Sequence, residues 1–512
     1  MPSTRKLLIV VAVVLVVLAV VLGIAARMIL GGDAVRIAIE QQASAALGQP
    51  VAIQTAAPRI FPKPAIHLTG VSIGAGKQVT IDRASLSTGL RALLSKRIED
   101  GELLIEGSRI DVRWALALFY LLSHTQPAAA GSSSGFSIVS VTALNLRDVE
   151  LLAAGRTLRL DMDSALTASD RLAVTRFDAR SETSDLSATG EFSSLSKRTG
   201  KFDVDADSLD VDGLLAFIAA TTPAGSQSAP AAKPPAPAGA PLELTIGLKA
   251  KKGIAVGAAF SSLSAACRVE GNNARLDGLS LNAFDGTFKG MVGLEGSGPQ
   301  PQFTWQGTFD GLDAGKVAAF TGTPGSVTGK LGGSVDIAAA GQDPAAAIRH
   351  AHGRARIVLS DGKLPGLDIV RGVILAFGKP TGDRPPGSGE TFSHLGATLA
   401  VADQRLTTND LTFASRDFDM TAKGALSLAS QTLNFQADII LSRELSAQAG
   451  RDLYRLARED DRVILPARIT GTVGAPTVFV DIAEALKRAL RNRAQDEVKS
   501  LFDRFRKKII RE

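Results

Sequence analysis

The sequence predicts a mainly β protein. An N-terminal transmembrane helix is followed by an elongated, curved antiparallel β-groove with a few short helices and a C-terminal amphipathic helix. Two observations underlie this prediction. Short runs of alternating apolar and polar residues recur through most of the chain, and Gly or Asp-Gly turn signals separate them about every 8–12 residues. In addition, one long uncharged apolar run lies near the N-terminus.

That apolar run covers residues 7–26 and contains no charge. At a rise of about 1.5 Å per residue, roughly 20 such residues span a hydrocarbon core about 30 Å thick. Arg5 and Lys6 precede the run, so the positive-inside rule predicts a cytoplasmic N-terminus and an exported body. A cleaved signal peptide is the alternative, since small residues lie near Ala25, but the run exceeds the usual signal-peptide core. We therefore expect an uncleaved anchor within residues 1–30.

The next element is a short amphipathic helix that ends at Gly48. Four apolar residues recur there at near-helical spacing, namely Val35, Ile39, Ala43 and Leu47. Strand patterns dominate beyond it. The predicted strands include residues 65–74, with Ile66, Leu68, Val71 and Ile73; residues 103–114, with Leu104, Ile110, Val112 and Trp114; and the meander 274–296. Helix-like runs interrupt them at residues 86–98 and 114–124.

Low-complexity stretches rich in Pro, Ala, Gly and Ser divide the body into regions. They cover residues 124–135, 221–241 and 378–390, and the middle one is the best candidate boundary. The predicted organisation is a β region over 31–220, a linker over 221–241, a second β region over 242–480 and a basic amphipathic helix over 481–512. That last helix suits an anionic membrane surface, a protein partner or the chain's own sheet.

Composition and motifs argue against an enzyme. The chain has 512 residues and a formal net charge of +6, which is modest for this length and gives no indication of a nucleic-acid partner. Its lone Cys267 excludes an internal disulfide framework. The G-x-S-x-G match at 131–135 lies in a low-complexity loop, and the phosphate-loop-like segment 325–330 is one residue short. We predict no catalytic residue and no cofactor.

A metal site is not expected either. His350 and His352 would point the same way on a strand, but no third ligand lies nearby in the sequence. The Asp-Gly pairs are spaced as turns rather than as paired acids. We interpret Asp361-Gly362 and Pro365-Gly366 as turn and kink residues, and Asp368 as the cap of a helix over 367–377.

An antiparallel sheet with few helices and few aromatic residues must still cover its apolar face. One solution is a curved trough whose inner wall of Leu, Val, Ile and Ala would accommodate acyl chains, because burying apolar surface is favourable by about 25 cal/mol per Å². A closed sandwich or barrel fits the periodicity equally well. Sample groove-lining candidates are Leu279, Leu281, Val358, Leu399, Val401 and Leu411.

Two parts of the chain resemble the AsmA-like proteins of the Gram-negative envelope. The N-terminal part of the resemblance lies within residues 48–114, at Gly48, Phe61-Pro62, Leu68, Val71, Leu93-Leu94, Ile105 and Ile110. The C-terminal part lies within 353–481, at Gly353, Asp361-Gly362, Gly366-Leu367-Asp368, Pro466, Gly471 and Pro476. The segment around 150–250 matches poorly.

The resemblance implies an inner-membrane anchor through residues 7–30 and a periplasmic body built as a repeating β-groove, as in chorein-type lipid-transfer proteins. It further implies phospholipid acyl chains as ligands, movement of phospholipid toward the outer membrane, and no catalytic residues. An outer-membrane or periplasmic protein partner is consistent with it. The alternative function is a scaffold or regulator of outer-membrane protein assembly that carries no lipid.

Overall fold

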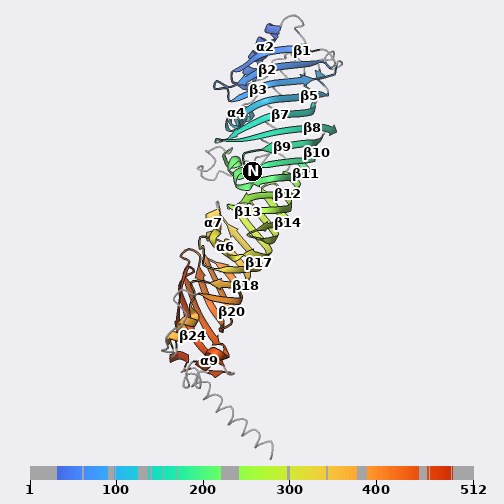
Figure 1. The fold of residues 1–512 in the computed structure, drawn as a ribbon. Helices are drawn as coiled ribbons and strands as arrows, with labels where there is room; N and C mark the ends of the chain where they lie inside the picture. The colour runs from blue at the N-terminus through green and yellow to red at the C-terminus, as the bar shows by residue number, and fades with distance from the viewer. Residues whose placement is uncertain are drawn as a thin grey trace, which may run out of the picture. The chain divides into compact units, whose positions relative to one another are not determined.

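A computed structural model describes most of the body of the chain. The described residues are 32–59, 63–89, 97–98, 100–124, 137–138, 141–153, 155–168, 170–220, 241–296, 300–341, 344–376, 389–448, 458–459, 462–481, 483–485 and 487. They form two compact units, Met1–Ala274 and Arg275–Glu512, whose division falls inside strand β14 (Asn273–Ala283). Figure 1 shows the strands and helices of both units.

The first unit contains an eleven-strand sheet whose strands are neighbours in chain order. In that order the strands are β1 (Val51–Arg59), β2 (Ala65–Ile73), β3 (Val79–Ser87), β5 (Gly101–Asp111), β7 (Val141–Ala153), β8 (Arg156–Ala168), β9 (Arg171–Arg180), β10 (Asp185–Ser194), β11 (Thr199–Asp210), β12 (Glu243–Ala255) and β13 (Ala258–Glu270). The short strands β4 (Arg97–Ile98) and β6 (Ser137–Ile138) form a separate parallel pair.

Two neighbouring pairs in this sheet are parallel, which the predicted antiparallel meander did not include. They are β5–β7 and β11–β12, and a helix follows the first strand of each pair: α4 (Val112–His124) and α5 (Val211–Ala220). A parallel pair requires such a crossover, because the chain must return to the same end of the sheet before the second strand begins. The predicted antiparallel fold is therefore correct for most neighbouring strands but not at these two positions.

An aspartate at the end of each of these strands starts the helix that follows. Asp111 accepts a hydrogen bond from the Trp114 amide at 3.1 Å, and Asp210 accepts one from the Gly213 amide at 2.7 Å. Both are N-caps, which satisfy amides that have no partner inside the helix. Because the cap at Asp111 ends β5, Val112 lies in α4 with Trp114, and the prediction that both belong to a strand was wrong.

The core of the first unit lies between helix α2 (Gly32–Leu47) and one face of the sheet. Ile39, Ala43 and Leu47 of α2 are buried in the same cluster as the β1–β5 side chains, so the predicted helix and its apolar stripe are confirmed. In β2 the buried residues are Ile66 and Leu68, followed by Val71 and Ile73.

In three neighbouring strands of this core, the alternation of buried and exposed residues is interrupted at the same cross-strand row. The row consists of Thr69, which pairs with Arg83, and Glu106, which also pairs with Arg83. In each strand every second residue is buried on both sides of the row, but the buried positions are shifted by one residue where the strand crosses it. Gly70 and Gly107, with φ of 59° and 61°, lie directly after the row in β2 and β5. A residue with left-handed backbone dihedrals shifts the alternation of side chains along a strand by one position. Glycine adopts these dihedrals without steric cost.

The second unit has a similar open sheet. Its neighbours in order are β15 (Gly286–Glu295), β16 (Gln302–Asp313), β17 (Thr328–Ala340), β18 (His352–Leu364), β19 (Glu390–Ala402), β20 (Arg405–Ala414), β21 (Phe418–Ser427), β22 (Leu433–Leu441), β24 (Arg462–Thr472) and β25 (Ala475–Val480). All these pairs are antiparallel, and β23 (Arg458–Glu459) pairs with the start of β24. Among the described strands of each unit, no pairing joins first to last, so neither sheet closes into a barrel.

In the described part of this unit, short helices accompany the sheet, among them α6 (Ala314–Phe320), α7 (Pro344–Arg349), α8 (Ile369–Ala376) and α9 (Arg443–Gln448). Helix α8 covers the sheet, and its Ile369 and Val373 are fully buried with Phe392, Phe413 and Ile439. The Glu390 carboxylate accepts from the Val370 amide at 2.8 Å, whereas the Asp368 carboxylate accepts from the Gly389 amide at 3.0 Å. The first turn of α8 is thus bound by Glu390, a residue that we did not expect in that role.

Several predicted elements lie elsewhere or outside the described residues. Asp361 lies inside β18 with φ 50°, so it is a kink within a strand, while Pro365-Gly366 forms a turn as expected. Of the helix-like run 86–98, residues 86–87 end β3, residues 88–89 have no regular secondary structure and residues 97–98 form β4. Among the described helices none is both long and apolar enough to span a bilayer. The anchor predicted within 1–30, the linker and most of 481–512 lie outside the described residues.

Candidate functional site

Each unit has one sheet face made almost entirely of apolar side chains, which we call the apolar face. In the first unit, residues that pair across five strands form rows on this face. One row is Phe177, Ala188, Val204, Leu248 and Ala265, and the next is Val174, Gly190, Phe202, Ile246 and Cys267. Paired residues point to the same side of a sheet, so these side chains form a continuous apolar surface.

The apolar face of the second unit contains most of its aromatic residues. Trp305 pairs with Val292 on β15 and with Ile337 on β17, and Phe309 pairs with Phe288 and Gly333. The Phe288 and Trp305 rings lie 5.4 Å apart between centroids. The row of Trp305 continues from Ile337 to Gly353 of β18, and the row of Phe309 continues from Gly333 to Ile357. Ile357 packs against the buried cluster beneath α8.

Part of this surface is uncovered. Beneath α8 the apolar face is buried, as at Phe413 and Ile439, which are 2% and 0% exposed. On β16, by contrast, Phe303 is 36% exposed and Trp305 is 41% exposed, although both belong to the same face. On β9–β12 of the first unit, Phe177, Phe202, Ile246 and Leu248 are only half-buried. In other proteins, large apolar side chains that are accessible side by side mark contacts with a protein, a membrane or a ligand.

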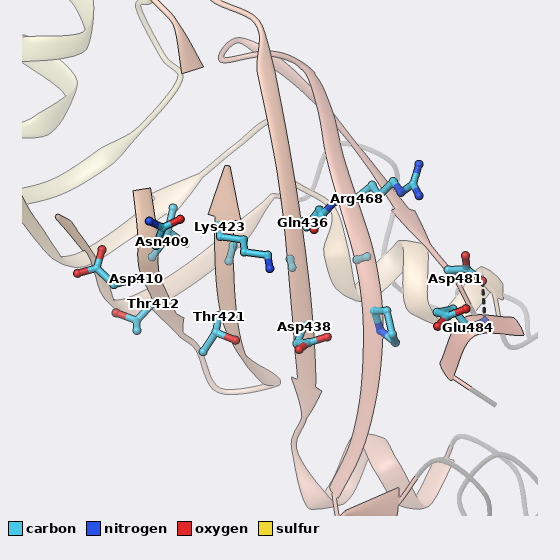
Figure 2. Close-up of a pocket in the computed structure, with 15 residues that line it drawn as sticks. Asn409, Asp410, Thr412, Thr421, Lys423, Gln436, Asp438, Arg468, Asp481 and Glu484 are labelled. Carbon is cyan, nitrogen blue, oxygen red and sulfur yellow. Dashed lines mark hydrogen bonds between the residues drawn. The ribbon is translucent and has the colours of Figure 1, made fainter. Parts of the chain in front are cut away.

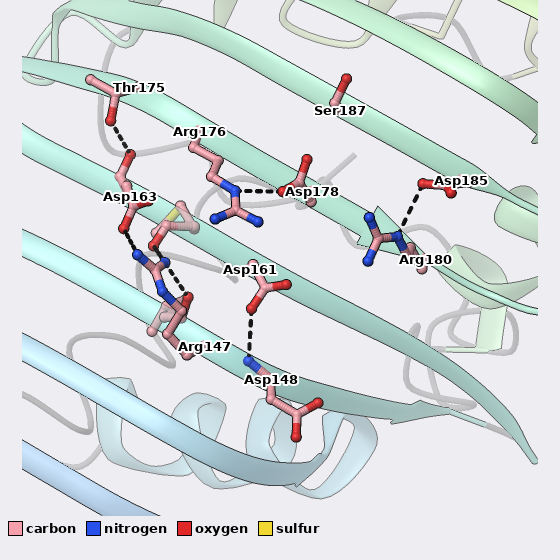
Figure 3. A network of polar contacts seen from close by, with 12 residues as sticks. Arg147, Asp148, Asp161, Asp163, Thr175, Arg176, Asp178, Arg180, Asp185 and Ser187 are labelled. Atoms are coloured by element: carbon pink, nitrogen blue, oxygen red, sulfur yellow. Dashed lines mark hydrogen bonds and ion pairs between the residues drawn. The ribbon is translucent and has the colours of Figure 1, made fainter.

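The opposite side of each sheet, which we call the polar face, is charged. In the first unit the Glu150 carboxylate accepts hydrogen bonds from Arg109 at 2.9 Å and from Arg159 at 2.7 Å. These two guanidinium groups hold the pKa of Glu150 below its usual range. Figure 3 shows the adjoining contacts, including Arg176 with Asp178 at 2.6 Å. The charged groups interact with one another both along a strand and across neighbouring strands, so this face is suited to water rather than to lipid.

The predicted groove-lining residues lie on both faces of the sheet. Leu399 pairs with Ala355 and Val401 pairs with Gly353, which places both on the apolar face. Leu411 packs against the buried cluster of the second unit. Val358 is adjacent to Ile357 and pairs with Gly396, so it lies on the polar face. Leu279 is 7% exposed, and it shares one side of β14 with Leu281.

Sequence reasoning missed the most exposed part of the apolar face. Phe303, Trp305 and Phe309 occur at positions i, i+2 and i+6 of the segment QFTWQGTF, which is a period-2 pattern with Thr304 and Gln306 between them. This alternation is detectable in the sequence, and because aromatic residues are scarce in this chain, their clustering was the available signal.

Several of the chemical groups considered in the sequence can be located among the described residues. No cluster of three or more potential metal ligands occurs there. His350 follows α7 and His352 begins β18, so the pair does not lie on one strand as the metal hypothesis required. Ser133 lies outside the described residues. Burial raises the pKa of the Cys267 thiol, which makes it a poor nucleophile.

A second feature is a trough of about 620 Å³ on the polar face of the second unit. It crosses β20, β21, β22 and β24, and Figure 2 shows Lys423, Gln436, Asp438 and Arg468 among its lining residues. Polar and apolar atoms both line it, and its charged side chains are two cations, Lys423 and Arg468, and four carboxylates, Asp410, Asp438, Asp481 and Glu484. Searches with the whole chain found no matching family model, no matching curated protein and no matching solved structure.

Proposed function

We propose that the chain is a non-enzymatic lipid-binding or lipid-transfer protein, anchored in the inner membrane with its body in the periplasm, and that its apolar faces bind phospholipid acyl chains. The observation that carries this proposal is the exposure of Phe303 and Trp305 on a face that is elsewhere the protein core. An acyl chain lying there would remove apolar surface from water, which is worth about 25 cal/mol per Å².

The distribution of charge supports the same ligand class. In the rows that cross β9–β13 and β15–β18, every residue on the apolar face is uncharged. Such a surface has no group that could recognise a lipid headgroup, so headgroups would remain in water beyond the strand ends. The ligand would therefore be selected by its acyl chains. The resemblance to AsmA-like proteins is consistent with this proposal and with transport toward the outer membrane.

Site-specific photocrosslinking in living cells would test the proposal on the full chain. A photoreactive phenylalanine at position 305, or at position 248 in the first unit, should form adducts with phospholipid that mass spectrometry detects. The matched controls are the neighbouring positions 306 and 249, because Gln306 and Lys249 lie on the polar face. We expect lipid adducts at 305 and 248 and few at 306 and 249.

Other outcomes would separate the alternatives. Equal lipid labelling on both faces would show that the adducts arise from general proximity to membranes, and would contradict the proposal. Protein adducts at position 305 without lipid would support the scaffold function instead.

A further inference from the structure

Helix α5 and the loop between β12 and β13 form an exposed apolar surface in the first unit. Residues 213–220 of the helix and residues 254–259 around the loop contain no polar side-chain atom, and we call these two segments together the apolar tip. None of the ten residues of α5 is buried. Leu215 and Ile218 of the helix are 58% and 52% exposed, and Ile254 beside the loop is exposed as well.

Asp212 joins the two segments of the apolar tip. Its carboxylate accepts hydrogen bonds from the Val256 amide at 2.8 Å and from the Gly257 amide at 2.7 Å, so the loop lies against the first turn of α5. The exposed apolar residues of the helix and of the loop are therefore held together as one surface. A contiguous surface of this kind is more informative than single exposed apolar residues, which are common in soluble proteins.

Val256 is held in an unfavourable backbone conformation at this surface. It is 77% exposed and has a φ of 53°, and Gly257 follows with a φ of 75°. Ala255 pairs with Ala258, so the loop has two residues, and a two-residue loop with positive φ at both positions favours Asn-Gly. A β-branched residue rarely adopts a positive φ. The strain and the exposure of Val256 together indicate a function outside the fold itself.

The chemistry of the apolar tip favours hydrocarbon over a protein partner. A protein interface has a polar rim and about one hydrogen bond per 100–200 Å², whereas no side chain of the tip can form one. A helix that is apolar on all sides is normally buried in a protein core or in lipid. The charges nearby almost cancel, because Lys251 pairs with Asp207 at 2.6 Å and the exposed Lys252 is balanced by Asp210 and Asp212, which accept from backbone amides.

We propose that the apolar tip inserts into the surface of a phospholipid bilayer and gives the body a membrane contact separate from the predicted anchor. Leu215, Ile218, Ile254 and Val256 would enter the acyl region, where removing apolar surface from water supplies the binding energy. With ten residues, α5 is about 15 Å long, so it would lie in the interface and would not span the bilayer. This proposal does not require acyl chains to bind to the apolar faces.

Vesicle flotation would test the proposal on the full chain held in amphipol, which covers any membrane-spanning segment. The probe is vesicles of phosphatidylethanolamine and phosphatidylglycerol. We expect the protein to float with the vesicles, and the double variant Ile218→Gln, Val256→Asn to have a partition coefficient at least about tenfold lower, because two large apolar side chains are lost. Asn suits the positive φ and Gln suits a helix, so the urea midpoint of this variant should not fall.

The matched control is Ile37→Gln, which removes an exposed isoleucine from helix α2 of the same unit and should leave the partition coefficient unchanged. Three results would overturn the proposal: no flotation of the unaltered protein, equal flotation of the double variant, or an equal loss in the Ile37 variant. Sedimentation velocity covers the remaining occupant, a second copy of the chain. Dimerisation that Val256→Asn abolishes, without flotation, would assign the tip to that contact instead. None of these results alters the expected lipid adducts at positions 248 and 305, so the two proposals can fail separately.

Discussion

Trp305 and Gln306 are consecutive residues of β16 that lie on opposite faces of the sheet. Trp305 pairs with Val292 and Ile337 on the apolar face, and Gln306 donates a hydrogen bond to Asp336 at 3.0 Å on the polar face. Because the two positions are adjacent in the chain, they can be compared directly in experiments on ligand binding.

The first prediction uses Trp305 as a fluorescent probe. The chain has two tryptophans, so Trp114→Phe leaves Trp305 alone. We expect phospholipids with brominated acyl chains to quench this fluorescence strongly, because bromine quenches at short range and the ring lies on the proposed binding surface. The matched control is a triple variant that combines Trp114→Phe, Trp305→Phe and Gln306→Trp. The fluorescence of its single tryptophan at position 306 should be quenched much less. Equal quenching of the two proteins would contradict binding on one face.

The second prediction concerns Cys267, which pairs with Ile246 on the apolar face of the first unit. Burial raises the pKa of its thiol, so little thiolate forms near neutral pH and a maleimide should react slowly. In a Cys267→Ser background, Ser264→Cys places a thiol on the exposed polar face of the same strand, opposite Lys249, and should react faster. Added phospholipid should slow the reaction at position 267 only, and protection at both positions would argue against the proposed surface.

The third prediction concerns stability in acid. Arg109 and Arg159 lower the pKa of Glu150 in the folded state, so the ionised carboxylate favours folding. This contribution is fully present above the ordinary glutamate pKa and is lost as the pH falls through the lowered folded value. Glu150→Gln should therefore reduce the urea midpoint at pH 7 and weaken its dependence on pH in the acid range.

Glu191→Gln is the control for this change, since it removes an exposed carboxylate from the same sheet without disturbing a pair of arginines. If the Glu150 and Glu191 variants show the same acid dependence, the arrangement around Glu150 contributes nothing measurable.

The fourth prediction compares two adjacent isoleucines of β22. Ile439 is 0% exposed within the core under α8, whereas Ile440 lies on the polar face, where it pairs with Asp419 and Ile464. Ile439→Ala should lower the free energy of unfolding by about 2–5 kcal/mol, because it leaves a cavity in a packed core. Ile440→Ala should cost clearly less. Chemical denaturation measures both values, and similar losses would show that the two faces are not packed as described.

Local signals in the chain were sufficient to predict the class of fold and many of its elements. Residues 65–73 show the alternation and its interruption at Thr69-Gly70, and the buried residues of β2 are those that the pattern indicates. The stripe of α2 was equally clear. The helix caps were harder to predict. Asp111 and Asp210 follow strand-like sequence, and each caps a helix only because its strand ends at that residue.

Which residues belong to the apolar face, in contrast, depends on the pairing of strands. Val358 and Leu399 were both reasonable candidates, yet they lie on opposite faces, since Leu399 pairs with Ala355 and Val358 pairs with Gly396. Side chains alternate with a period of two, so one left-handed residue such as Asp361 changes which face the later residues of its own strand occupy. Alternation and turn chemistry are properties of neighbouring residues and can be read along the chain. Register, parallel crossovers and the uncovered part of the apolar face arise from contacts between distant segments, so only the folded structure could determine them.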